Sequence, residues 1–216
     1  MHDDMSHHHL NQIFLDKSVP REKLVEMWSN ISLNYDQKYR HEKFLGPKIV
    51  AEAVHKYTAP SDVTKIIILD VGAGTGLVAA HLQEYGFTNF DAVEPATGMT
   101  EILISKNVYS RVIQDYIGDH QIDIEDNTYD VVTLSGAFMP NSIPTSGVKE
   151  LVRFLKPGGI LVNCMREEFL EDEWYSDLEP FMQELEDNGV WKRLLRKTIP
   201  GYFYEKQGIL HVYRKC

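Results

Sequence analysis

The sequence has little cysteine and no long hydrophobic run. Its two cysteines are Cys164, inside an apolar stretch, and Cys216. These two thiols supply neither a disulfide framework nor the spacing of a metal site, which fits a reducing compartment. No stretch approaches the roughly 18 apolar residues of a membrane helix, and Met1 to Leu10 is polar and rich in histidine, unlike a signal peptide. We therefore expect a cytoplasmic protein with no membrane partner.

Basic charge is also scarce. The chain has 22 lysines and arginines against 32 acidic residues, which gives a formal net charge of −10. A chain of this charge repels a phosphate backbone, so nucleic acid is not expected as a partner. Hydrophobic residues make up 43% and charged residues 25% of the 216 positions, close to the globular average. This composition excludes a disordered or fibrous chain and predicts a single folded domain.

The domain is expected to span residues 18–216. Residues 1–17 have few apolar groups and no periodicity, which predicts a flexible tail, and we expect His7 to His9 to be solvated there. Apolar side chains then recur at the spacing of an amphipathic helix, at Leu24, Met27, Trp28 and Ile31. A second helix is predicted over about Pro47 to Tyr57. These helices form an N-terminal region, residues 18–60, ahead of a core over residues 64–216.

From Lys65 onward, short apolar runs alternate with helical patterns. The expected strands are residues 65–70, 89–94, 110–114, 129–135 and 159–165. Repeated strand–helix units form a parallel sheet with helices on both faces, so the predicted fold class is α/β. A long helix is then expected over Trp174 to Leu185, ended by Gly189. The last two strands, residues 190–199 and 208–213, are predicted to form an antiparallel hairpin through Pro200 and Gly201.

A glycine-rich loop follows the first strand of this pattern. Asp70 to Gly76 reads Asp-Val-Gly-Ala-Gly-Thr-Gly, and open sheets bind ligands at the carboxyl ends of their strands. The dinucleotide fingerprint G-x-G-x-x-G fails because position 77 is Leu. Asp70 would repel a pyrophosphate, whereas it suits a cationic amino-acid ligand such as S-adenosylmethionine. Glu94 ends the second strand, where an acid can accept hydrogen bonds from both ribose hydroxyls of this cofactor or of NAD.

Four ordered motifs resemble those of class I S-adenosylmethionine-dependent methyltransferases. They are Ile-Leu-Asp-Val-Gly-Ala-Gly-Thr-Gly at 68–76, Phe-Asp-Ala-Val-Glu-Pro at 90–95, Tyr-Asp-Val-Val at 129–132 and Leu-Lys-Pro-Gly-Gly-Ile-Leu at 155–161. The resemblance covers about residues 45–214. It implies a Rossmann-like three-layer αβα sandwich, with a seven-stranded, mostly parallel sheet, one antiparallel strand and an N-terminal helical lid. Residues 135–138, 155–161 and 175–191 are most similar to the Williams-Beuren-region methyltransferase-like proteins, a similarity that implies no settled substrate.

The resemblance also implies roles for individual residues. S-adenosylmethionine would be the cofactor and S-adenosylhomocysteine the product. Gly72, Gly74 and Gly76 would surround the methionine moiety, Glu94 would bind the ribose, and Met99 would pack on the adenine face. The other residues expected to contact the cofactor are Asp70, Ala73, Pro95, Tyr116 and Ser135.

Two further assignments stay open between alternatives. Asp115 and Asp119 both suit the adenine amino group; Asp115 is preferred because it follows the third strand directly, although Asp119 lies in the commoner Gly-Asp dipeptide. Tyr35 lies in a segment, residues 34–39, that resembles the part of related enzymes that closes over the cofactor. It is expected either to contact the cofactor or to support a contact between helices.

No residue stands out as a catalytic base. Methyl transfer is an in-line displacement, so alignment of the reactants can supply much of the acceleration. Residues 135–138 lack the acids of a magnesium-dependent catechol-type enzyme, and no metal is expected. If the acceptor must lose a proton, the candidates near the strand ends are His41, His120, Arg166, Glu167 and Glu168.

The leading functional prediction is a methyltransferase for a small-molecule acceptor. A protein methyltransferase and a non-catalytic regulatory protein that binds the cofactor are the alternatives, and an NAD-dependent oxidoreductase is disfavoured by the loop spacing. The Asn/Asp-Pro-Pro-Tyr signature of nucleic-acid methyltransferases is missing after the fourth strand. Monomer and homodimer both remain open, because packing on the sheet explains the apolar stripe of residues 174–185.

Overall fold

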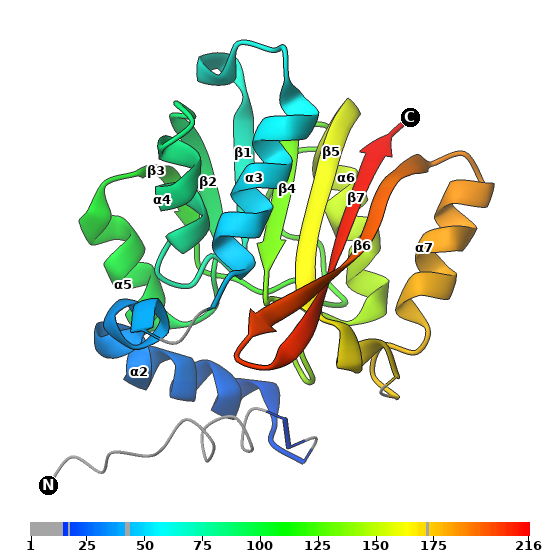
Figure 1. Ribbon diagram of the computed structural model, residues 1–216. Coiled ribbons are helices and arrows are strands. Elements are labelled where there is room, and N and C mark those ends of the chain that lie inside the picture. The colour runs from blue at the N-terminus through cyan, green and yellow to red at the C-terminus, as the bar shows by residue number, and fades with distance from the viewer. Residues whose placement is uncertain (1–14, 17, 42–43, 172) are drawn as a thin grey trace, which may run out of the picture.

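The chain folds around one mixed sheet (Figure 1). The computed structural model describes residues 15–16, 18–41, 44–171 and 173–216, so the tail expected over residues 1–17 lies almost wholly outside the described residues. The seven strands stand in the order β3-β2-β1-β4-β5-β7-β6. Their bounds are β1 (Ile67–Val71), β2 (Asn89–Val93), β3 (Tyr109–Ile113), β4 (Tyr129–Ser135), β5 (Leu155–Arg166), β6 (Trp191–Phe203) and β7 (Lys206–Lys215).

Strand β7 is antiparallel to both of its neighbours, β5 and β6, whereas the pairs among β1 to β5 are parallel. This confirms the expected seven-stranded sheet with one antiparallel strand. Strands β1 and β4 are buried along almost their whole length, which accounts for their near-continuous apolar runs in the sequence. The edge strand β3 is only partly buried.

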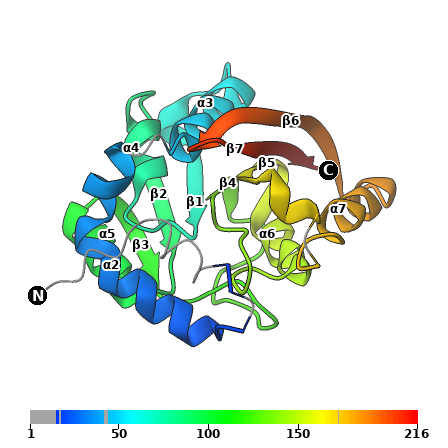
Figure 2. The same cartoon turned by 60° about the horizontal axis from the view of Figure 1, so that its bottom comes forward.

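Helices cover both faces of the sheet (Figure 2). They are α2 (Arg21–His41), α3 (Gly46–Thr58), α4 (Leu77–Gln83), α5 (Thr97–Lys106), α6 (Val148–Phe154) and α7 (Leu178–Asp187), with short 3-10 turns η1 (Val63–Lys65), η2 (Thr145–Gly147) and η3 (Glu167–Glu171). One apolar core joins α3 and α4 to one face, and a second joins α6 and α7 to the other. The three-layer αβα sandwich is therefore confirmed.

The hairpin turn lies later in the chain than the sequence predicts. Strand β6 continues through Pro200 and Gly201, and the turn consists of Tyr204 and Glu205. The pairing of β6 with β7 shifts between Ile199 and Phe203, which marks a bulge. Strand β6 is the edge of the sheet, and a bulge on an edge strand is one of the few strand positions where proline is tolerated.

Two helices differ from the expected bounds. Helix α2 continues through residues 34–39, so the segment that resembles the closing part of related enzymes belongs to the last part of that helix. Helix α7 begins at Leu178 rather than Trp174, whose side chain is 39% exposed. The helix ends before Gly189, which has a φ of +69° as the sequence predicts for a terminating glycine.

Helix α2 crosses the sheet edge formed by the carboxyl ends of the parallel strands (Figure 1). It packs mainly on α5, and the close fit is visible at Gly98, where a Cβ would lie 2.4 Å from the Ser29 carbonyl oxygen. No helix among the described residues is long and apolar enough to cross a membrane. The same described residues contain no group of three histidine, cysteine or acidic side chains able to hold a metal ion.

Candidate functional site

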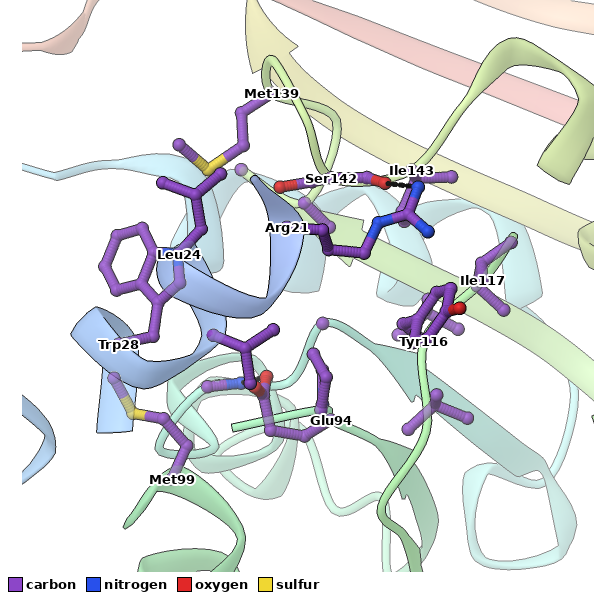
Figure 3. A pocket seen from close by; sticks show the side chains of 18 of the residues that line it. Arg21, Leu24, Trp28, Glu94, Met99, Tyr116, Ile117, Met139, Ser142 and Ile143 are labelled. Carbon is purple, nitrogen blue, oxygen red and sulfur yellow. Dashed lines mark hydrogen bonds between the residues drawn. The ribbon is translucent and has the colours of Figure 1, made fainter. Parts of the chain in front are cut away.

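A pocket lies between α2 and the carboxyl ends of the central strands (Figure 3). Its floor comes from the loops after β1, β2, β3 and β4, which converge because parallel strands end at the same edge. Helix α2 contributes one wall and the loop from Met139 to Ile143 another. Nine of the residues expected to bind a cofactor line it: Tyr35, Gly72, Gly74, Glu94, Pro95, Met99, Asp115, Tyr116 and Ser135.

The glycine loop turns tightly beneath this pocket. Gly72 and Gly74 have φ angles of +64° and +58°, a region that side chains rarely adopt. The Gly72 amide donates to the carbonyl oxygen of Val93 at 2.8 Å, which ties the loop to β2. A Cβ on Gly72 would lie 2.7 Å from the Cβ of Ala137, whereas a Cβ on Gly74 would meet no protein atom within 4 Å. The backbone at Gly74 therefore borders open space that a ligand can approach.

Glu94 lies at the end of β2 and is only 6% exposed. Its Oε2 accepts a hydrogen bond from the Gly74 amide and its Oε1 accepts one from the Ala96 amide, both at 2.9 Å. Burial raises the pKa of the Glu94 carboxyl, and the two amide hydrogen bonds counteract part of this rise. An ionised carboxylate has about four acceptor sites, so acceptor capacity remains for two hydroxyl groups.

Asp70 lies beneath the glycine loop and does not line the pocket. Its Oδ2 accepts a hydrogen bond from the Tyr109 hydroxyl at 2.9 Å, and its Oδ1 accepts one from Thr133 Oγ1 at 3.0 Å. Burial raises the pKa of Asp70 to about 7, against the effect of these two hydrogen bonds. Ala73 and Gly76, also expected at the site, likewise lie outside the lining.

A polar cluster joins the C-terminal part of α2 to the glycine loop. The Asp36 carboxylate accepts hydrogen bonds from Thr75 Oγ1 and, at 2.8 Å, from Lys106 Nζ on α5. Lys106 also donates to the Thr75 carbonyl oxygen. The Gly98 amide adds a hydrogen bond to Ser29 Oγ at 3.2 Å. These contacts were missed from the sequence because nothing in the local pattern pairs Asp36 with Thr75.

Arg21, the first residue of α2, joins this end of the helix to the far wall of the pocket (Figure 3). Its Nη2 donates to the Ser142 carbonyl oxygen at 3.1 Å and its Nε to that of Asn141 at 3.4 Å. The guanidinium carbon lies 4.4 Å from the centre of the Tyr116 ring. Sequence reasoning assigned no role to Arg21, although it recognised Leu24 and Trp28 as the apolar face of this helix. That face lines the pocket.

Four of the five candidates for a catalytic base lie outside the pocket lining. His120, Arg166, Glu167 and Glu168 do not line it, and the side chain of His41 lies outside the described residues. His120 Nε2 is 3.0 Å from Asp115 Oδ1, and Glu167 Oε1 accepts from Thr198 Oγ1 at 2.7 Å. Asp119 also lies outside the lining and accepts from Ser146 Oγ, whereas Asp115 lines the pocket.

Comparison with known proteins connects this geometry to one class. Residues 69–163 match the family described as "Methyltransferase domain". The chain is 28% identical to human Methyltransferase-like protein 27 over 75% of the chain and 65% of that protein. It is 33% identical to the demethylmenaquinone methyltransferase of Clavibacter sepedonicus over 69% of the chain and 60% of that protein.

The solved structures agree on the fold. A putative S-adenosyl-L-methionine-dependent methyltransferase from Methanococcus maripaludis superposes with a TM-score of 0.58 at 18% identity, over 85% of this chain and 92% of that one. The chain spans 55–65% of the length of the curated relatives it matches. The first of these relatives is itself a methyltransferase-like protein, in keeping with the narrower resemblance drawn from the sequence.

Proposed function

Since the chain contains a class I S-adenosylmethionine-dependent methyltransferase domain, we propose that it transfers a methyl group to a small-molecule acceptor by in-line displacement. The observation that carries this proposal is the covered pocket, which brings the glycine loop, Glu94 and a largely apolar wall together. The bound cofactor supplies a methyl group on a sulfonium, and the chain aligns the acceptor with that methyl group and excludes water.

The residues around the pocket fit the cofactor. We propose that Glu94 binds the ribose hydroxyls through its remaining acceptor sites, and that Met99, buried in α5 and lining the pocket, packs on the adenine. The open space beside Gly74 suits the methionine moiety. Asp115 is favoured over Asp119 as partner of the adenine amino group, because only Asp115 lines the pocket. Tyr35, Pro95, Tyr116 and Ser135 complete the proposed contacts.

The proposed role of Asp70, Ala73 and Gly76 is structural and does not involve contact with the cofactor. They shape and support the glycine loop from outside the pocket lining. Asp70 accepts hydrogen bonds from Thr133 on the neighbouring strand β4 and from Tyr109 on β3, and these tie the carboxyl end of β1 to both strands. This role keeps the loop glycines in their tight turn without direct contact between Asp70 and the ligand.

A small acceptor is favoured over a protein chain because α2 lies across the pocket. Arg21 joins the first turn of α2 to the carbonyl groups of Asn141 and Ser142, and Asp36 joins the C-terminal part of the helix to Thr75. We propose that α2 and α3, within residues 18–60, act as the lid of a single domain over residues 18–216. The proposal also keeps the sequence expectations of a cytoplasmic protein that uses no metal and binds neither nucleic acid nor membranes.

The test is to incubate the protein with methyl-labelled S-adenosylmethionine and a cell extract, and then to separate the label by molecular size. We expect label in small metabolites, and none when Glu94→Ala replaces the wild-type protein. Label in protein would instead support a protein methyltransferase. Binding of S-adenosylhomocysteine without any transfer, across extracts from several sources, would favour a non-catalytic regulatory protein.

Gly74→Ala is expected to weaken binding of S-adenosylhomocysteine by about tenfold or more, because its Cβ projects into the open space beside the loop. Calorimetric titration measures this loss. The added strain at a φ of +58° costs roughly 1 kcal/mol of stability. Gly189→Ala is the matched control, since Gly189 has a φ of +69°, equally open surroundings and a place outside the pocket. Equal losses of affinity in both variants would argue against a ligand at Gly74.

A further inference from the structure

The ionisable groups of the pocket are unevenly distributed. Besides its tyrosines, the lining formed by the described residues contains two carboxylates, Glu94 and Asp115, and one cation, Arg21. Both carboxylates come from the strand ends and are taken up by the proposed ribose and adenine contacts. Figure 3 shows Arg21 on the opposite side of the pocket from Glu94. Arg21 packs on Tyr116 and donates to the 139–143 loop, which supplies none of the proposed cofactor contacts. Its positive charge therefore lies at the border between the cofactor contacts and the rest of the pocket.

The charge of Arg21 has no acidic partner among the described residues. No carboxylate oxygen of that part of the chain lies within the 4.0 Å of an ion pair, and its hydrogen bonds go to two backbone carbonyl groups. These occupy two of the five N–H donors of a guanidinium. The neutral Tyr116 ring beneath it leaves the net charge unchanged. In a chain with a formal net charge of −10, an uncompensated cation inside a pocket requires an explanation.

The stability of α2 does not explain the presence of a positive charge at position 21. Arg21 is the first residue of α2, and a cation at this end of a helix is disfavoured by the helix dipole. The carbonyl groups of the 139–143 loop and the Tyr116 ring hold the guanidinium in a fixed orientation. A planar guanidinium held in this way is prepared to bind an anionic oxygen group through two parallel hydrogen bonds.

We infer that Arg21 binds an anionic oxygen group, a carboxylate or a phosphate, on the methyl acceptor. The inference rests on the proposed function and names its substrate class. The remaining wall is apolar, with Leu24, Trp28, Met139 and Ile143, so the acceptor carries an apolar body next to its anionic group. The anionic group serves recognition, and a separate nucleophile on the same molecule receives the methyl group.

Two simple probes test this inference without knowledge of the acceptor. Benzoate and benzamide have the same apolar body, but only benzoate carries a charge. Each is titrated into the complex of the protein with S-adenosylhomocysteine, and binding is followed by the indole resonance of Trp28, which lines the pocket. Trp28→Phe identifies that resonance. We expect benzoate to bind about tenfold more tightly than benzamide, because a charged hydrogen-bond partner is the stronger one.

Arg21→Gln is expected to abolish this preference for benzoate. The titrations use a concentration of S-adenosylhomocysteine that saturates each variant, so a change in cofactor affinity does not enter the comparison of benzoate with benzamide. Lys23→Gln is the matched control: it removes one positive charge from the same helix, at an exposed position that pairs with Glu26. A preference that is absent in the wild type, or that survives in Arg21→Gln, would overturn the inference. The proposed function fails separately, by the absence of transferred label in the extract assay.

Discussion

Glu94→Ala is expected to weaken binding of S-adenosylhomocysteine by about 100-fold or more. A hydrogen bond to a charged group contributes about 1.5–3 kcal/mol, so the loss of two ribose contacts amounts to at least about 3 kcal/mol. At about 1.4 kcal/mol for each factor of ten, this corresponds to two orders of magnitude in affinity. Calorimetric titration of wild-type and variant protein measures the difference directly.

Glu94 also contributes to the stability of the fold, so the experiment has to separate its effect on ligand binding from its effect on stability. Its carboxylate accepts from the amides of Gly74 and Ala96, and alanine would leave both donors without a partner. Glu94→Gln retains one carbonyl oxygen, which can accept from one of the two amides, and is expected to preserve more of the stability to urea than Glu94→Ala while still losing much of the affinity. If Glu94→Gln and Glu94→Ala both bound the ligand as the wild type does, Glu94 would have no place in the cofactor site.

Asp70→Asn is expected to make the protein more resistant to urea than the wild type at pH 8. At pH 5 this advantage of the variant over the wild type is expected to be smaller. Burial raises the pKa of Asp70 in the folded state to about 7, from 3.8. Between these two pH values the folded state retains a proton that the unfolded state releases, so this group's contribution to stability decreases as pH rises. The full decrease amounts to about 4 kcal/mol, of which about 2 kcal/mol falls between pH 5 and pH 7.

The measurement is the free energy of unfolding of wild-type and variant protein at several pH values between 4 and 8. Asp123→Asn provides the control, because the Asp123 side chain is fully exposed and its ion pair with Arg111 is expected to contribute little. A difference between Asp70→Asn and wild type that stayed constant across this range would show that Asp70 titrates normally in the folded protein.

Local patterns in the sequence predicted most of the fold. The strands at 89–93 and 129–135 and the helix at 97–106 are found almost where the apolar periodicity places them. These predictions succeed because burial leaves an apolar pattern that is visible within a few residues, near-continuous in the strand at 129–135 and alternating in the strand at 89–93. The hairpin turn was misplaced because proline and glycine are also tolerated at a bulge in an edge strand, and edge position is not a local property.

The candidate site likewise combines features that local sequence determines with features that only tertiary packing determines. The sequence by itself determined the glycine loop, Glu94 and their common position at the strand ends, since a loop after a parallel strand must lie at that edge of the sheet. Only the tertiary structure decided that Asp70 lies beneath the loop, that Asp36 binds Thr75, and that Arg21 reaches the pocket. Arg21 and Asn141 are 120 positions apart in the chain. Such contacts depend on how whole elements pack against one another, and no short-range pattern of residues encodes that packing.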